Sequence, residues 1–303
     1  MLSVRFWGVR GSIPCPGRNT VEFGGNTACL EIRADKRLLI IDVGTGVKQL
    51  GDWIMGNDFK NGPISTDIFL SHTHWDHIMG FPMFAPIFIP STKLIIRGPV
   101  TYNDETLQSI IGDQLSYKYW PVSLGDLSAK ISYQELKETS IDLGDGLNVT
   151  TKCLNHPILC LGYRFEYKGK TIVTAYDHEP FRNFFPTDPE DPGYDEAAAQ
   201  EGEAAAKEAN ERILKFYKGA DVLIHDAQYT TAEFEKHLGW GHSSYEYAIE
   251  AACQAGVKKL IFFHHDPIRT DAQLQYLSDV YKNSCKENLE IIMAKEGQTI
   301  EAV

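Results

Sequence analysis

Residues 71–77 read SHTHWDH and place three histidines and one aspartate within seven positions. The β-branched and aromatic run TDIFLSH, 66–72, predicts a strand that ends inside this cluster. His72 and His74 are two positions apart, so their side chains point to the same side of an extended chain. Asp76 and His77 follow as the chain turns toward a helix expected over IMGFPMF, 78–84. One turn can therefore present four polar ligands.

Imidazole and carboxylate groups together suit Zn²⁺, Mn²⁺ or Fe²⁺. The six cysteines form no C-x-x-C pair, so no thiolate cage for a structural zinc is predicted. A lone histidine is more often an ordinary core or surface residue than a ligand. With 10 histidines in 303 residues, however, this cluster is not expected by chance. We therefore interpret 71–77 as a catalytic metal-binding loop.

The remaining pattern indicates a layered α/β fold. The runs 27–34 and 37–44 predict a hairpin across Asp35 and Lys36, and further strand-like and helical runs occur in both halves of the chain. The final stretch, LEIIMAKEGQTIEA, predicts a terminal pair of strands. Neither a repeat nor a linker divides the chain, so we expect one domain over 1–303.

One segment is unusual in composition. Residues 186–212 form a proline-rich and acidic loop that runs into an alanine- and glutamate-rich helix. The simplest interpretation is a surface insertion with a solvated helix, and a lid or a dimer contact is the alternative.

Charge and hydropathy exclude some classes of function. Lys and Arg number 29 against 41 Asp and Glu, a net charge of −12, which gives no long-range attraction for nucleic acid. The N-terminus lacks the layout of a signal peptide, and no run approaches the length of a membrane span. We expect a cytoplasmic protein that does not bind a membrane.

The motif HTHWDH resembles the H-x-H-x-D-H motif of the metallo-β-lactamase-fold hydrolases. The resemblance covers nearly the whole chain, from IDVGTG at 41–46 to the histidine pair at 264–265. It implies an αββα sandwich, in which two mixed β-sheets are flanked by helices. It also implies two divalent metal ions; zinc is the one we expect, with manganese or iron as alternatives.

The resemblance also implies the ligands. LNHPILCLGYRF offers His156, GKTIVTAYDHE offers Asp177, and KKLIFFHHDP offers His264, with His265 as the alternative because a slip of one residue reverses the side chain's direction. The implied first metal site consists of His72, His74 and His156. The implied second site consists of Asp76, His77 and His264, and Asp177 is shared between the two.

Two later segments resemble ribonuclease Z and the related phosphonate-pathway phosphodiesterases, namely ADVLIHDAQY, 220–229, and GWGHSSYEYAIEAA, 239–252. The resemblance implies that His242 binds phosphate and protonates the leaving group, with Asp226 orienting it. We therefore expect His242 and Asp76 to be catalytic. The alternative for GHSS is a plain helix N-terminus capped by Ser243 or Ser244.

The sequence indicates the type of reaction more clearly than the identity of the substrate. Only 20 residues separate His156 from Asp177, which leaves no room for the long arm with which bacterial ribonuclease Z grips transfer RNA. The expected function is hydrolysis of small or cyclic phosphodiesters by metal-bound hydroxide, with nucleic acid disfavoured. The alternatives are an ester, thioester or lactone hydrolase and an RNA 3′-end processing nuclease. Formation of a homodimer is left open.

Overall fold

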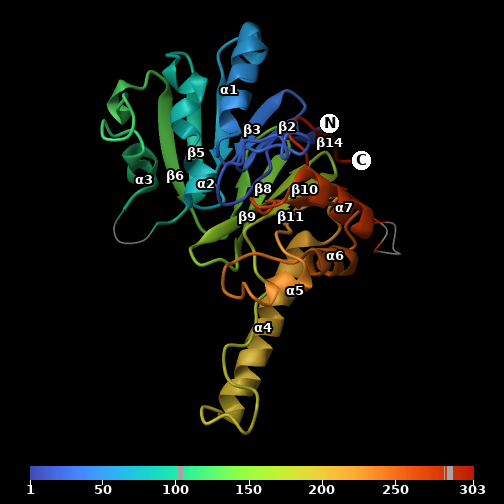
Figure 1. Cartoon of the computed structure of the whole chain (residues 1–303). Helices are drawn as coiled ribbons and strands as arrows, with labels where there is room; N and C mark the ends of the chain where they lie inside the picture. Colours follow the sequence, from blue (N-terminus) through green and yellow to red (C-terminus); the bar gives the residue numbers. More distant parts are fainter. Residues whose placement is uncertain (102–104, 283, 285–288) are drawn as a thin grey trace.

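The computed structural model describes residues 1–101, 105–282, 284 and 289–303, and within these ranges the strands form two seven-stranded sheets (Figure 1). The first sheet has the order β14-β1-β2-β3-β4-β5-β6. Its strands are β1 (Leu2–Gly8), β2 (Cys29–Ala34), β3 (Arg37–Ile41), β4 (Ser65–Phe69), β5 (Lys93–Pro99), β6 (Lys130–Leu136) and β14 (Thr299–Glu301). The predicted hairpin across Asp35 and Lys36 is confirmed, because β2 and β3 pair antiparallel with Ala34 opposite Arg37.

The second sheet has the order β13-β12-β11-β10-β9-β8-β7. Its strands are β7 (Ser140–Asp142), β8 (Leu147–Leu154), β9 (Cys160–Tyr167), β10 (Lys170–Ala175), β11 (Val222–Asp226), β12 (Lys259–Phe263) and β13 (Glu290–Met293). Each sheet is mixed. Strands β3 to β6 and β10 to β13 are parallel, and the other pairs are antiparallel.

Apolar side chains form three layers. The layer between the sheets is rich in aromatic residues, and Phe69 packs edge-on against Tyr163 and Phe165 at centroid distances of 5.2 and 5.6 Å. Helices α1 (Val47–Gly56) and α3 (Leu107–Asp113) cover the outer face of the first sheet, and α6 (Tyr245–Gln254) and α7 (Asp271–Tyr281) cover that of the second. The predicted αββα sandwich is confirmed.

Helix α4 (Glu196–Tyr217) forms most of the segment singled out by its composition. Only its C-terminal part, with Ile213, Phe216 and Tyr217, packs into the apolar layer, and the rest projects away from the sheets together with the preceding loop (Figure 1). Asp195 caps its N-terminus by accepting a hydrogen bond from the Ala198 amide at 2.9 Å. We call residues 186–212 the acidic arm.

Two predicted elements differ from the structure. The helix expected over 78–84 is instead α2 (Trp75–Ile78) followed by single 3₁₀ turns, because Pro82 cannot donate the next helical hydrogen bond. The expected terminal strand pair is wrong, since β13 extends the second sheet and β14 crosses to pair with β1 in the first.

The short elements complete the fold. They are helix α5 (Thr231–Phe234) and the 3₁₀ turns η1 (Asp58–Asn61), η2 (Phe81–Met83), η3 (Ala85–Phe88) and η4 (Leu124–Asp126). Of the helices in the described ranges, none combines the length and hydropathy that a membrane-spanning segment requires.

Candidate metal centre

The expected ligands lie at the carboxyl ends of strands. The HTHWDH motif follows β4, while His156 follows β8, Asp177 follows β10 and His264 follows β12. Strands that run in the same direction present their carboxyl ends at one edge of a sheet, so segments far apart in the sequence meet there. All seven residues expected to bind metal occur in this cluster, which we call the His/Asp cluster.

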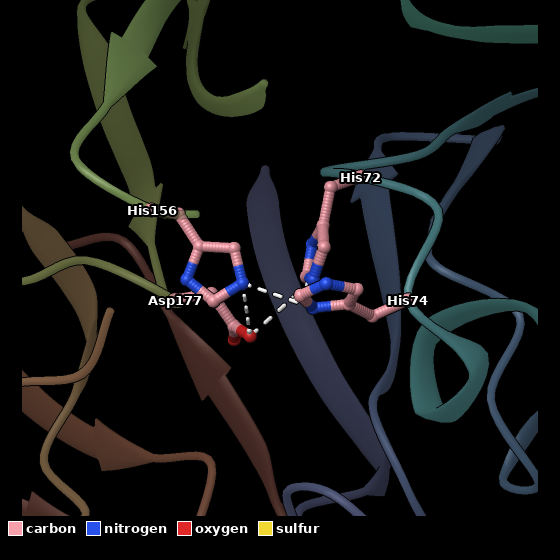
Figure 2. Close-up of side chains that lie close together, drawn as sticks. All are labelled: His72, His74, His156 and Asp177. Carbon is pink, nitrogen blue, oxygen red and sulfur yellow. Dashed lines mark hydrogen bonds and ion pairs between the residues drawn. The ribbon is translucent and has the colours of Figure 1, made fainter. Parts of the chain in front are cut away.

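The first group consists of His72, His74, His156 and Asp177, whose candidate ligand atoms all lie within 4.8 Å of one another (Figure 2). His156 Nε2 lies 3.0 Å from His74 Nδ1 and 3.7 Å from Asp177 Oδ2. His72 Nε2 lies 3.4 Å from the same carboxylate oxygen. The side chains from the two sheets thus converge on one point.

A second group consists of Asp76, His77 and His264, and a third joins Asp177 and His264 to Asp226 and His242. His264 Nε2 lies 3.2 Å from Asp76 Oδ2, 3.2 Å from His77 Nε2 and 3.2 Å from Asp177 Oδ1. Asp177 therefore contacts both groups, with Oδ2 near His72, His156 and His77 and Oδ1 near His264. That arrangement is what a ligand shared by two ions requires.

The backbone selects His264 over its neighbour. His264 has a φ of 60° and Asp177 has a φ of 62°, a left-handed conformation that is strained in residues other than glycine and is common at functional sites. The turn at His264 sends its ring to the cluster. His265 instead donates from Nε2 to the Ala294 carbonyl at 2.9 Å, and burial lowers its pKa to about 3.

The cluster has the properties of a cation site. Among the described residues, the buried His72 Nε2 and Asp177 Oδ1 have no hydrogen-bond partner, although polar atoms in a folded interior are nearly always paired. Burial, and then repulsion from His77, lowers the pKa of His72 well below its usual value, which keeps its nitrogen available as a ligand. The cluster is therefore capable of binding metal ions, and its nitrogen and oxygen donors fit the divalent ions named above.

Hydrogen bonds behind the cluster orient several of its rings. Asp42 Oδ2 lies 2.8 Å from His77 Nδ1, and the Gly241 carbonyl lies 3.0 Å from His156 Nδ1. Such outer contacts hold a proton on Nδ1 and leave Nε2 toward the centre. Asp42 also accepts from the amide and hydroxyl of Ser71, both at 2.7 Å. This explains the IDVGTG turn, to which sequence reasoning gave no specific role.

His242 lies at the edge of the cluster. Its ring stacks on His264 at a centroid distance of 5.0 Å, and its Nδ1 lies 2.8 Å from Asp226 Oδ2. Burial disfavours charge on this ring, but Asp226 and the more distant carboxylates raise the pKa of His242 to about 9. The Asp226 carboxylate is therefore within hydrogen-bonding distance of His242. Ser244 caps α6 by accepting from the Tyr247 amide, so the capping interpretation of GHSS is confirmed, and it leaves His242 beside the cluster.

Sequence reasoning missed Glu179. This side chain is 3% exposed and accepts hydrogen bonds from the Gly239 amide at 2.8 Å and the Gly241 amide at 2.9 Å. It thereby anchors the loop that contacts His156 and leads into His242. An acidic residue two positions after Asp177 was visible in the sequence, but its partner 60 residues away was not.

The glycine-rich N-terminal segment also reaches the cluster. The Ser12 amide donates to Asp76 Oδ2 at 2.7 Å, and a Cβ atom on Gly11 would lie 2.3 Å from the His264 ring. Gly11 is therefore required for close approach of the backbone to His264.

Comparison with known families agrees with this geometry. Residues 23–172 match the model of the metallo-beta-lactamase superfamily. The chain carries a metallo-beta-lactamase domain. Together with the His/Asp cluster, this match places the chain among the metal-dependent hydrolases of that superfamily.

Individual relatives of this metallo-beta-lactamase domain include ribonuclease Z of Lactococcus lactis subsp. lactis strain IL1403. It is 28% identical over 291 residues, which cover 87% of this chain and 88% of the relative. Human tRNase Z, short form, has a similar structure, with a TM-score of 0.62, 18% identity and 99% of each chain covered. A diphosphatase from the PhnP family superposes with a TM-score of 0.63 at 14% identity, covering 99% of this chain and 98% of its own. At these identities the structures establish the fold.

Proposed function

We propose that this chain is a metal-dependent phosphodiesterase that acts on small or cyclic phosphodiesters. The observation that carries the proposal is the placement of a histidine held by a carboxylate, His242 with Asp226, beside a buried cluster suited to two cations. Ester hydrolysis at phosphorus needs both a cationic centre and a proton donor for the leaving oxygen.

The roles of the cluster follow from its two groups. One divalent ion would be held by His72, His74 and His156, the other by Asp76, His77 and His264, with Asp177 shared. Ions in these positions would lower the pKa of a water molecule and polarise the phosphoryl oxygen, and we expect zinc, with manganese or iron as alternatives.

His242 completes the reaction as the acid. Its Nδ1 is bonded to Asp226, which leaves Nε2 for the substrate, and the raised pKa keeps the ring protonated at neutral pH. As water adds to phosphorus and one P–O ester bond breaks, the departing alkoxide takes the proton from His242. The products are a phosphomonoester and an alcohol, or, from a cyclic diester, one phosphomonoester that carries the freed hydroxyl group.

The names of the relatives favour a larger substrate. Curated relatives are named ribonuclease Z, which favours an RNA and weighs against our expectation that nucleic acid is disfavoured as a substrate. The net charge of −12 favours the small diester, because a large polyanion gains from basic surface. RNA 3′-end processing is therefore the second candidate.

The choice can be tested with a panel of substrates after metal removal and re-addition. Bis-p-nitrophenyl phosphate, cyclic nucleotides, p-nitrophenyl acetate and a precursor transfer RNA would each be assayed with Zn²⁺ or Mn²⁺. We expect metal-dependent turnover of the small diesters. A kcat/KM for the precursor far above that of every small diester would establish RNA as the substrate, and turnover of the acetate alone would establish a carboxylic esterase.

The role of His242 predicts a dependence on the leaving group. His242→Ala should lower kcat by about 10²–10⁴-fold for a cyclic nucleotide, whose alkoxide needs a proton. It should lower kcat much less for bis-p-nitrophenyl phosphate, because p-nitrophenolate departs without protonation. His237→Ala, a histidine that stacks on Tyr229, serves as the control. Equal losses on both substrates would rule out the acid role.

A further inference from the structure

An apolar pocket with a volume of about 530 Å³ lies against the metal-binding loop. One wall is the face of α2 and the turn after it, formed by Trp75, Ile78 and Met79 at positions i, i+3 and i+4. Asp76 and His77, on the other side of the same turn, point into the His/Asp cluster. The pocket and the cluster thus share one helical turn.

The opposite wall comes from α3 and the segment after it. Ile110 and Gln114 line the pocket from one face of this helix, and Tyr119 and Trp120 follow. Three of the lining residues are therefore large aromatic rings, counting Trp75, which is 69% exposed. Aromatic rings and a methionine pack best on a flat ring.

The polar groups that line the pocket indicate which kind of ring it can bind. Among the described residues that line it there is no Lys or Arg, and the one charged residue is Asp113, so a second phosphate would be repelled. The exposed polar groups that an occupant would meet are the Asp113 carboxylate and the Tyr119 hydroxyl. A ring with polar atoms at its edge can pair with such groups, whereas a hydrocarbon chain cannot.

The distance between the pocket and the His/Asp cluster limits which molecules can occupy both. A phosphate at the cluster and a ring in the pocket would be separated by the width of one helical turn, roughly 10 Å with side chains. A nucleoside spans such a separation, and the ethyl or methyl group of a simple diester does not.

We propose that this pocket binds the base of a nucleoside phosphodiester, which makes nucleotides, rather than simple sugar or alkyl phosphates, the substrate class. The inference rests on the proposed phosphodiesterase function. It adds a specificity site built from Trp75, Met79, Gln114, Tyr119 and Trp120.

The test compares two esters with the same leaving group, thymidine 5′-p-nitrophenyl phosphate and ethyl p-nitrophenyl phosphate. Because both contain the nitrophenyl ring, its own binding cancels in the ratio of their kcat/KM values. We expect the wild-type protein to favour the thymidine ester by about tenfold or more, the scale of one stacked base.

Two tyrosine variants then locate the effect. Tyr119→Ala should lower the ratio roughly fivefold or more, because Tyr119 lines the pocket. Tyr117→Ala removes the same side chain two residues away, outside the pocket lining, and should leave the ratio unchanged. Both residues are more than 70% exposed, so neither change threatens the fold. A wild-type ratio near one, or equal losses in both variants, would overturn the proposal.

Failure of the proposed function gives a different result. If neither ester is hydrolysed with added metal, the phosphodiesterase proposal fails, and binding of thymidine measured by ligand-observed NMR decides the pocket. Binding that is lost in Tyr119→Ala but retained in Tyr117→Ala supports the base site. Absence of binding to the wild-type protein refutes it.

Discussion

Replacing Glu179 by glutamine should detach the loop that carries His242 without unfolding the sheets. The buried Glu179 carboxylate accepts from two backbone amides, those of Gly239 and Gly241, at 2.8 and 2.9 Å. Both amides donate to Oε2, and the Gly239 amide also lies 3.0 Å from Oε1. A glutamine oxygen in the Oε2 position keeps both bonds without their charge, and its amide group in the Oε1 position then faces the Gly239 N–H. Loss of the charge from two buried hydrogen bonds, together with the opposed pair of N–H groups, costs about 2–4 kcal/mol.

That cost should appear as local opening of the loop. A change of about 2 kcal/mol accelerates exchange through an opened state by roughly thirtyfold, so the Gly239 and Gly241 amides should exchange at least that much faster. Because the Gly241 carbonyl contacts His156 and the next residue is His242, kcat on a phosphodiester should fall by about tenfold or more. Hydrogen exchange with mass spectrometry and steady-state kinetics measure the two effects.

Asp221→Asn is the matched control. Asp221 is also buried and accepts from a backbone amide, that of Thr171 at 2.8 Å, but it precedes β11 at the end opposite Asp226. This variant should lose stability and keep its kcat. If Glu179→Gln opens the loop and kcat stays within twofold of wild type, the loop does not position the catalytic groups, and our reasoning is refuted.

Two further predictions concern the proton donor and a metal ligand. Because Asp226 raises the pKa of His242, Asp226→Asn should lower that pKa. The alkaline limb of the profile of kcat against pH should then move to lower pH by about one unit or more. A limb that does not move would exclude His242 as the titrating acid. Gly11→Ala should displace the His264 ring and reduce the amount of bound metal, which mass spectrometry measures. Gly17→Ala is the control and should leave the metal content unchanged, because the nearest atom to its added Cβ would lie 3.7 Å away. Equal metal content in the two variants would show that the site tolerates the shift.

The HTHWDH loop could be predicted from its spacing alone, whereas His156, Asp177 and His264 were implied by the resemblance to a known family. Each of these ligands follows an apolar strand, and the structure brings them together with His72. The choice between His264 and His265 could not be derived in the same way. It depends on a left-handed turn at His264, which strand alternation does not contain.

Strand pairs and hydrogen bonds between residues far apart in the chain could not be predicted from the sequence either. The run 289–301 has the composition of a hairpin, yet each of its strands pairs with a different sheet, because each sheet had an open edge to fill. Glu179 shows the same limit at the site, since the amides that it binds lie 60 and 62 residues further along the chain. The sequence pattern predicts which side chain follows a strand, whereas the residues that hold that side chain in place depend on tertiary contacts.

The acidity of the chain is compatible with an anionic substrate because much of it lies in the acidic arm. This segment contains nine acidic and two basic residues, which supply −7 of the net charge of −12. Helix α4 has 22 residues and is therefore roughly 33 Å long, and only its C-terminal end packs on the sheets (Figure 1). Screening at physiological salt acts over about 8 Å, so a small diester at the cluster experiences little of the charge at the tip. An RNA long enough to pass the arm would be repelled by it, and we therefore expect the arm to favour a small diester over the larger substrate.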